Sequence, residues 1–236
     1  MFSIIIPTYN ERNNIALLIE KIDRVFALER QDYEMIVVDD DSPDNTFQYV
    51  QEVSQNNHHV RGIRREKERG LSSAVLRGFE EAKGEVMAVI DADHSHDEYL
   101  LSTMFALVKE GKADCVVGSR RVAGGGADRW PFYRKWLSNF ATFVAHIFTG
   151  IQVKDPMSGY FCIDRRLYEK AKEYFRPKGY KILLEILVKA RPKKYVELPY
   201  IFVDRKQGYS KLSVSVAVDY LKQIFELFWY RLCKTF

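Results

Sequence analysis

The sequence predicts an α/β fold built on a mostly parallel, doubly wound sheet. In the first half of the chain, short apolar runs alternate with segments of helical periodicity, a rhythm typical of repeated strand–helix units. Polar residues follow directly after several of these apolar runs, where strands of such a sheet would end. Open α/β sheets bind their ligands beyond the carboxyl ends of the strands, so these polar clusters form the candidate site.

The expected strands of the first half are short and apolar. They cover residues 3–7, 35–38, 60–63, 86–90 and 115–117. Helices are expected between them, the first with Ile15, Leu18, Ile19, Ile22 and Phe26 on one face and others over residues 72–83 and 97–109. The polar clusters are Tyr9 with Glu11, residues 39–41, Asp91 with Asp93, and Ser119 with Arg120. Because parallel strands end at the same edge of a sheet, we expect these clusters to converge.

The second half of the chain is less regular. Three glycines at residues 124–126 indicate a loop, and strands are expected over residues 160–163 and 195–203. Residues 136–149 carry no Lys, Arg, Asp or Glu and have a helical apolar face, and the tail from about Ser213 is an amphipathic helix. We therefore expect one α/β domain over residues 1–212 and a C-terminal interfacial helix over residues 213–236.

Composition bounds the class of protein. With 236 residues, 47% hydrophobic and 29% charged, the chain is globular rather than disordered. Its three cysteines lack metal or disulfide spacing, which favours a reducing, cytoplasmic compartment. We expect neither a signal peptide nor a membrane span, because no uncharged apolar stretch reaches about 20 residues. Residues 115–170 are locally basic. Such a segment can bind an anionic partner, namely phosphate, nucleic acid or an anionic membrane, or it can be an ordinary solvated surface.

The segment Asp91-Ala92-Asp93 follows a strongly apolar expected strand, residues 86–90. Two carboxylates one residue apart can hold a hard cation, directly or through water, and Mg²⁺ or Mn²⁺ held there would also bind diphosphate oxygens. Such a pair repels itself unless a cation neutralises it. His94 and His96 raise zinc as an alternative, but alternate positions of an extended segment point in opposite directions, which disfavours a shared ion.

A second acidic segment and several basic residues complete the candidate site. Asp39 can accept hydrogen bonds from a base or a ribose, while Ser42 and Asp44 suit the start of the next helix. Arginine and lysine side chains bind phosphate oxygens. The candidates for phosphate binding are Arg120, Arg129, Arg134 and Lys181. Ser, His and Cys form no nucleophilic set, and neither a Gly-x-Ser-x-Gly nor a Walker-type phosphate loop is present.

Seven segments together resemble the dolichol-phosphate mannosyltransferases, members of the inverting GT-A polyprenyl-phosphate glycosyltransferases of family 2. The segments are residues 4–11, 37–46, 91–96, 118–120, 130–134, 155–161 and 205–212, in the expected order over nearly the whole chain. His94 replaces the family's usual Leu, and His96-Asp97 replaces its usual His-Pro. Some relatives carry a membrane-spanning tail, and we do not expect one within these 236 residues.

The resemblance implies a role for individual residues. Nucleotide binding is implied for Pro7, Tyr9, Glu11, Val38, Asp39, Asp91 and Ala92, and metal binding for Asp91, Asp93 and Ser95. Binding of the acceptor or its phosphate is implied for Arg120, Arg134, Ser158, Lys181, Arg205 and Lys211. The residues expected to carry catalysis are Asp93, Arg120, Arg134 and Arg205.

The implied reaction transfers mannose from GDP-mannose to a polyprenyl phosphate with inversion and with Mg²⁺ or Mn²⁺. The expected partners are the nucleotide sugar, the lipid and the cytosolic surface of a membrane, with a membrane-anchoring partner subunit left open and no nucleic acid. A transferase of the same fold with UDP-glucose, another donor or another acceptor is the main alternative. A nucleotidyltransferase would usually open with a glycine-rich phosphate loop, and an acidic receiver module is about half this length.

Overall fold

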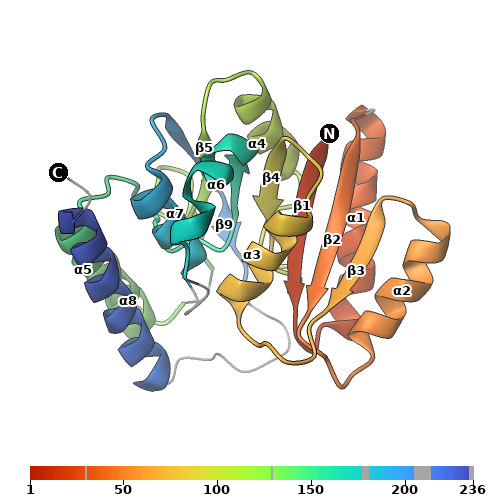
Figure 1. Cartoon of the computed structure of the whole chain (residues 1–236), viewed down its shortest axis with the longest axis horizontal. Helices are drawn as coiled ribbons and strands as arrows, with labels where there is room; N and C mark the ends of the chain where they lie inside the picture. Colours follow the sequence, from red (N-terminus) through yellow and green to blue (C-terminus); the bar gives the residue numbers. More distant parts are fainter. Residues whose placement is uncertain (30, 129, 177–180, 205–213, 234–236) are drawn as a thin grey trace.

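The core of the protein is a twisted sheet with helices on both faces (Figure 1). The computed structural model describes residues 1–29, 31–128, 130–176, 181–204 and 214–233. Within these residues, seven strands form one sheet in the order β3 (Val60–Arg64), β2 (Tyr33–Asp39), β1 (Phe2–Thr8), β4 (Val86–Val89), β7 (Phe161–Asp164), β5 (Cys115–Ser119) and β8 (Tyr195–Pro199). The predicted α/β fold class is confirmed.

The sheet is parallel except at β7. Strand β1 pairs in parallel with β2 on one side and β4 on the other, with Ile4 opposite Met35 and Ile5 opposite Val89. Strand β7 runs antiparallel between β4 and β5. Both faces of β1 and β2 are covered, which is why these strands are continuously apolar instead of alternating.

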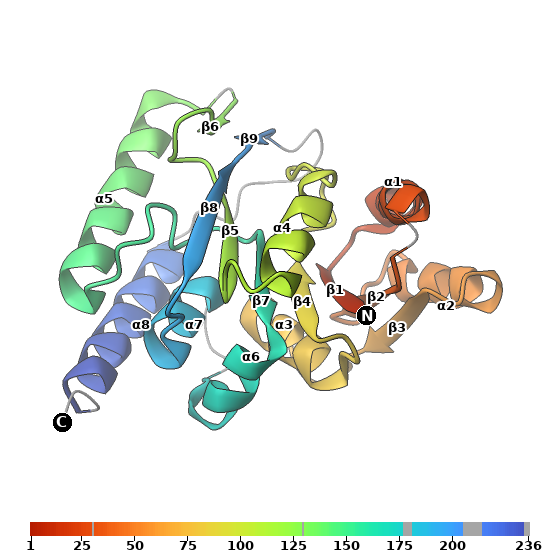
Figure 2. The same cartoon turned by 90° about the horizontal axis from the view of Figure 1, so that it is seen from above.

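Two layers of helices sandwich the sheet (Figure 2). Helices α1 (Arg12–Glu29), α2 (Thr46–Asn56) and α4 (Leu100–Lys109) pack on one face, over a core that includes Ile4 and Ile6. Helices α3 (Leu71–Glu81), α6 (Arg165–Ala171) and α7 (Ile182–Ala190) pack on the other face, over a core that includes Ile5, and the short helix η1 (Lys172–Tyr174) follows α6. Successive side chains of β1 thus point to opposite faces of the sheet and are buried in different hydrophobic cores.

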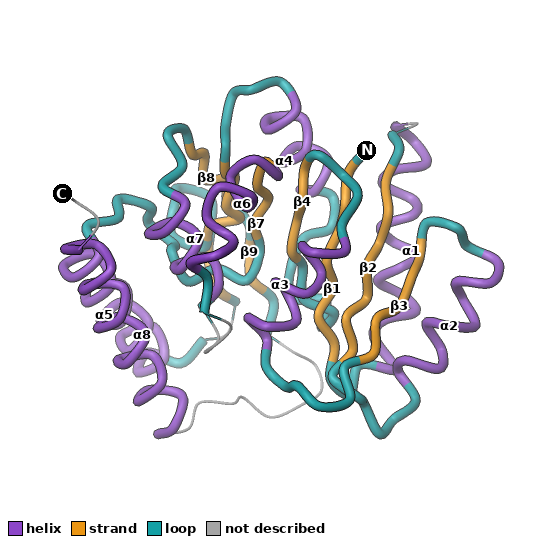
Figure 3. The backbone as a smooth tube through the Cα atoms, viewed as in Figure 1, coloured by secondary structure: helices purple, strands orange, loops and turns teal. Residues whose placement is uncertain are grey.

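Helices α5 (Phe132–Thr149) and α8 (Val214–Cys233) lie side by side beyond α7 (Figures 1 and 3). Ile224 and Leu227 of α8 are buried with α7 side chains, and the hydroxyl of Tyr220 donates to the carbonyl of Ala141 at 2.6 Å. The helices expected over residues 136–149 and in the tail are therefore present. Helix α8 does not stand apart from the α/β core, because it shares buried side chains with α7.

Two sequence expectations about the second half were wrong or incomplete. Residues 195–203 were expected as one strand, but β8 ends at Pro199 and Ile201–Phe202 form β9, which pairs with β6 (Gly126–Ala127) in a separate small sheet. Tyr200 separates the two strands, because its buried ring packs edge-on against Tyr160 and turns the chain out of the main sheet. Helix α7 was not predicted, since almost all of its residues are apolar and buried and it shows no polar face.

Candidate functional site at the carboxyl edge of the sheet

The loops that follow β1 and β2 are joined by hydrogen bonds from backbone to side chain. The backbone N–H of Asn10 donates to the Ser42 hydroxyl at 2.9 Å, and the N–H of Arg12 donates to Asp44 at 3.0 Å. Asp44 also accepts from the backbone N–H of Thr46 at the start of α2. Asp44 therefore bonds the start of α2 as expected, whereas the Ser42 hydroxyl bonds Asn10 and Asp39 and joins the loops after β1 and β2 instead of capping the helix.

Asp39 is fully buried and directed into the protein. Its carboxylate accepts hydrogen bonds from the Thr8 hydroxyl at 2.9 Å, from the Ser42 hydroxyl at 2.6 Å and from the Ser42 backbone N–H at 2.8 Å. A carboxylate has about four acceptor sites, so three are already used inside the rim. The nucleotide-binding role of Asp39 stays a prediction, and its observed contacts order the loop after β2.

The remaining nucleotide candidates differ in how much surface they present. Pro7 and Val38 are opposite each other in the β1–β2 register and both are buried, so their side chains offer little to a ligand. Tyr9 is half-buried, with the guanidinium of Arg69 5.2 Å from its ring centre. Glu11 is also half-buried and accepts from the Asn14 amide at 2.6 Å.

Asp40 and Arg65 form a buried ion pair that the sequence did not reveal. Nε of Arg65 donates to Asp40 Oδ1 at 2.7 Å, and the backbone N–H of Gly70 donates to Asp40 Oδ2 at 2.8 Å. The same guanidinium donates to the Ser73 hydroxyl at 2.8 Å. This pair joins the loop after β2 to the start of α3. A run of three aspartates before a Ser-Pro turn gave no sign of which one was paired.

The acidic loop after β4 carries the candidate metal ligands. Asp91 and Asp93 are half-buried, Ala92 between them is buried, and Asp93 Oδ1 accepts from the Ser95 backbone N–H at 3.1 Å. The Ser95 hydroxyl is buried and has no hydrogen-bond partner among the described residues. A buried hydroxyl without a partner is costly, and a cation or its water would satisfy it. Two carboxylates and this hydroxyl fit Mg²⁺ or Mn²⁺.

The two histidines of this loop have separate surroundings. Across the described residues, no group of three or more His, Cys, Asp or Glu side chains is arranged to hold an ion. Nδ1 of His96 accepts the backbone N–H of Asp91 at 3.3 Å, and its ring stacks on Tyr160. His94 is half-buried at a left-handed backbone position (φ 58°), and its pKa is lowered by burial and by the charge of Lys21.

Arg120 is bound edge-on to Asp155 at the end of β5. Nε of Arg120 donates to Asp155 Oδ2 and Nη2 donates to Oδ1, both at 2.7 Å, and the backbone N–H of Arg120 adds a third bond. Burial alone would raise the pKa of Asp155, but the hydrogen bonds and charge of Arg120 outweigh it and lower that pKa. Burial also works against the charge of Arg120, while Asp155 raises its pKa. This pair uses two of the five guanidinium N–H donors.

Arg134 lies over the same indole ring as Arg120. Their guanidinium carbons are 4.3 Å and 5.5 Å from the ring centre of Trp130, and Arg134 also donates to Asp204 at 2.9 Å. Trp130 was part of the recognised pattern but was not among the expected site residues. The other two basic candidates, Arg205 and Lys211, lie outside the described residues, as does Arg129.

Lys181 belongs to the same group of charges. It immediately precedes α7 and is half-buried, and its pKa is lowered by burial and then by the positive charge of Arg120. Asp155 and Asp91 oppose that shift, so Lys181 interacts electrostatically with both acids and with Arg120. Arg120 in turn interacts with Asp91. The structure thus brings the loop after β4, the end of β5 and the start of α7 to one place.

Ser158 has a structural contact where a phosphate contact was expected. Its hydroxyl donates to the Gly118 carbonyl at 2.7 Å and accepts the backbone N–H of Tyr160 at 3.1 Å. A hydroxyl has a single proton, and the one on Ser158 is used within the protein. The observed bonds therefore fix β5 against the start of β7, and the phosphate-binding role of Ser158 gains no support from them.

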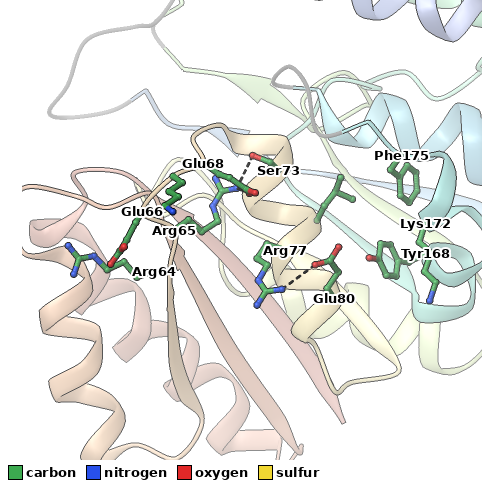
Figure 4. A pocket seen from close by; sticks show the side chains of 12 residues that line it. Arg64, Arg65, Glu66, Glu68, Ser73, Arg77, Glu80, Tyr168, Lys172 and Phe175 are labelled. Carbon is green, nitrogen blue, oxygen red and sulfur yellow. Dashed lines mark hydrogen bonds and ion pairs between the residues drawn. The ribbon is translucent and has the colours of Figure 1, made fainter.

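A cavity of about 620 Å³ lies away from this group of charges, between α3 and α6 (Figure 4). Arg65, Arg77, Tyr168 and Lys172 are among its lining residues. Arg77 is paired with Glu81 at 2.6 Å, and Lys172 with Glu169 at 2.7 Å. Because these cations are neutralised locally and the acidic loop after β4 does not line the cavity, we place the candidate site at Asp91, Arg120 and Lys181 instead.

The chain belongs to glycosyl transferase family 2, whose profile matches residues 3–171. It is 45% identical over 227 residues to the dolichol-phosphate mannosyltransferase of Pyrococcus furiosus, covering 95% of this chain and 63% of that protein. Identity to the proteins of the same name from Mycosarcoma maydis and Saccharomyces cerevisiae is 37% and 35%, with 97% and 98% of this chain and 79% and 88% of theirs covered. The resemblance inferred from the seven segments is confirmed.

Solved structures share the fold at much lower identity. Mannosyl-3-phosphoglycerate synthase from Rubrobacter xylanophilus matches with a TM-score of 0.71 and 17% identity, covering 95% of this chain and 72% of that one. Glucosyl-3-phosphoglycerate synthase from Mycobacterium tuberculosis, solved with Mn²⁺, UDP and glucosyl-3-phosphoglycerate, matches with a TM-score of 0.66 and 16% identity, covering 98% and 79%. The expected glycosyltransferase fold is therefore confirmed.

Proposed function

We propose that this protein transfers mannose from GDP-mannose to a polyprenyl phosphate and inverts the configuration at the anomeric carbon. The three relatives named above support the reaction, and the chain spans 63% of the length of the archaeal one. The observation that carries the proposal is the gathering of Asp91, Arg120 and Lys181 at one edge of the sheet. Such a site places an acidic loop, suited to a cation, beside fixed positive charge, suited to phosphate.

The donor side is assigned to the loops after β1, β2 and β4. Asp91, Asp93 and Ser95 would hold the divalent cation, and the half-buried Tyr9 and Glu11 are the candidates for the nucleoside. A divalent cation in such a site supplies positive charge that offsets the charge developing on a leaving nucleoside diphosphate. The solved fold relatives with Mn²⁺ or Mg²⁺ and UDP support a cation of this kind.

The acceptor side is assigned to Arg120, Arg134 and Lys181, together with Arg205 and Lys211. A phosphate monoester has a second pKa of about 6, so its oxygen is already ionised near neutral pH and needs no general base. This fits the absence of an evident base in the sequence. The basic side chains would orient the phosphate so that one oxygen attacks the anomeric carbon opposite the leaving diphosphate.

Membrane contact is assigned to the outer surface of α5 and α8. Large apolar side chains are exposed on both helices: Phe132, Trp136, Phe140, Phe143 and Ile147 on α5, and Leu221, Phe225, Trp229 and Leu232 on α8. Among the described residues, no helix combines the length and hydropathy of a membrane span. Two neighbouring helices with exposed aromatic rows suit an interface with lipid. We propose peripheral binding at the cytosolic face, with or without an anchoring subunit.

The test offers labelled GDP-mannose and, in parallel, labelled UDP-glucose to the protein with polyprenyl phosphate, detergent and Mn²⁺ or Mg²⁺. Label should enter the organic phase from GDP-mannose, and the product should have the inverted anomeric configuration. Transfer from UDP-glucose alone would replace the donor while keeping the chemistry. No transfer of label from either donor to the lipid, with nucleotide binding intact, would reject the proposed reaction.

A further inference from the structure

The carboxylate of Asp91 lies between two neighbours that restrict it. On one side, Nε2 of His96 is 3.9 Å from Asp91 Oδ2, while Nδ1 of the same ring accepts the Asp91 backbone N–H at 3.3 Å. On the other side, a Cβ atom added at Gly159 would lie 3.1 Å from the same oxygen. The backbone and the side chain of Asp91 are therefore both adjacent to one imidazole.

The imidazole is itself held firmly. It is buried, stacks on the ring of Tyr160 at 4.9 Å and 15°, and meets Tyr200 and Phe202 edge-on at 5.5 Å and 6.0 Å. The Tyr160 hydroxyl donates to the carbonyl of Asp97 at 2.7 Å, which closes the loop around the ring. A ring fixed by three aromatic neighbours and a hydrogen-bonded loop can set the direction of the group it faces.

The two ring nitrogens of His96 have different roles. A backbone N–H is always a donor, so the nitrogen that faces it must be the unprotonated acceptor. Nε2 is the ring nitrogen nearer the side chain, 3.9 Å from Asp91 Oδ2. At this distance the contact is longer than a hydrogen bond, so the ring acts on the carboxylate through packing and on the backbone through the bond at Nδ1.

We propose that His96 is a positioning residue for Asp91, which fixes the backbone and the carboxylate of this ligand in the orientation that binds the divalent cation. The inference rests on the proposed function, because it takes Asp91 as a ligand. Residues that contact and orient metal ligands typically change metal affinity by about 10–100-fold when they are replaced. The aspartate–x–aspartate motif does not predict this role, because only the folded loop brings the His96 ring against Asp91.

The experiment titrates the full chain with Mn²⁺ in the presence of saturating GDP or UDP and follows free Mn²⁺ by electron paramagnetic resonance. His96→Phe keeps an aromatic ring against Tyr160 and removes both nitrogens. We expect Mn²⁺ affinity to fall by about 10-fold or more. The metal-free affinity for the nucleotide and the thermal midpoint should stay near those of the wild type, which a general loss of structure would not allow.

Two further variants separate the two contacts of the ring. His96→Asn retains an acceptor near the position of Nδ1, and His96→Gln retains a donor near Nε2, so both should bind Mn²⁺ with an affinity between those of the wild type and His96→Phe. They also keep the inference testable if His96→Phe does not fold. A wild-type affinity in His96→Phe, or in both other variants if His96→Phe does not fold, would overturn the inference.

His94→Asn is the matched control, because it changes a histidine of the same loop at a left-handed position that asparagine tolerates. It should leave Mn²⁺ affinity unchanged, and a loss as large as that of His96→Phe would overturn the inference by assigning the effect to the loop as a whole. A wild-type protein that binds no Mn²⁺ with either nucleotide would reject the metal site itself. Normal Mn²⁺ binding in both the wild type and His96→Phe would reject only the role of His96.

Discussion

The two halves of the molecule differ in which side chains they expose to solvent. In the first half, strands β1 and β2 are buried along their whole length, and the polar residues at their ends, such as Asp39 and Asp40, are bonded to neighbouring loops. In the second half, β8 is partly exposed, and helices α5 and α8 present aromatic residues to the outside, with Phe132 84% and Phe225 60% exposed.

The difference supports the two kinds of partner that we propose. A rim whose side chains are fixed by internal hydrogen bonds is preorganised for a small polar ligand. A row of exposed aromatic rings has a free-energy cost in water and gains from contact with an apolar phase. The group of charges formed by Asp91, Arg120 and Lys181 joins the two halves. Asp91 follows β4 of the first half, and Lys181 precedes α7, which packs against α8 in the second half.

The largest expected effect concerns the buried pair that anchors the second half. Asp155→Asn would leave the Arg120 guanidinium without its carboxylate, and breaking a buried pair in this way costs about 3–5 kcal/mol. For a chain of this size, each kcal/mol lowers the melting temperature by roughly 2–4 °C. Calorimetry should therefore show a drop of about 6 °C or more at neutral pH.

The same pair has a defined pH dependence. Because the folded pKa of Asp155 is lowered, its contribution is present above the unfolded pKa of about 3.9 and is lost as the pH falls toward the folded value. The difference in melting temperature between the wild type and Asp155→Asn should then become smaller below about pH 4. Asp164→Asn is the control, because Arg166, its partner, is exposed, and a surface pair contributes about 1 kcal/mol or less. Equal drops in both variants would contradict the buried-pair argument.

Asp93→Ala tests the acidic loop of the first half. Because Asp93 lies on a loop at the sheet edge, turnover should fall by about 10²–10³-fold while the melting temperature stays close to that of the wild type. The label-transfer assay measures the first quantity and calorimetry the second. Asp97→Asn is a matched control in the same loop, since Asp97 is exposed and its contact with the Tyr99 N–H can be kept by asparagine. Normal turnover in Asp93→Ala would remove Asp93 from the metal site.

The double variant Trp136→Ser with Phe225→Ser tests the outer surface of α5 and α8. Each side chain is 60% exposed, and full burial of such a residue contributes about 1.5–3 kcal/mol, so partial insertion of two should change liposome binding by about 10-fold or more. Substitution is preferable to deletion of the tail, because deletion would also uncover the α7 side chains buried beneath Ile224 and Leu227. Leu28→Ser, 85% exposed on α1, is the control. Unchanged sedimentation with liposomes would reject the surface.

The smallest expected effect concerns Lys181. Its pKa is lowered by burial and by Arg120, so its positive charge should be lost at a pH below the usual lysine value of about 10.4. The KM for the acceptor should rise across that alkaline range. In Lys181→Arg the charge persists and the rise should move to higher pH, whereas Lys172→Arg, at an exposed position, should leave it in place. If the rise in KM at alkaline pH occurs at the same pH in Lys181→Arg as in the wild type, Lys181 does not belong to the acceptor site.

Sequence reasoning succeeded where one local pattern had one structural solution. Apolar runs such as Ile4-Ile5-Ile6 that end in polar residues predicted the strands and their order along the chain, and they placed the candidate site at one edge of the sheet. It was incomplete where a contact joins distant segments. Arg120 was expected to hold phosphate, but its partner Asp155 lies 35 positions later, and Arg65 lies 25 positions after Asp40.

By itself, the sequence determined the fold class, the acidic loop at Asp91 and Asp93, and the two amphipathic helices. These follow from periodicity and from residues close together in the chain, which secondary structure converts directly into geometry. Only the tertiary structure decided that Asp39 points inward, that residues 195–203 divide between two sheets and that His96 faces Asp91. Each of these depends on which segments pack together, and packing is settled by the burial of whole surfaces rather than by any local pattern.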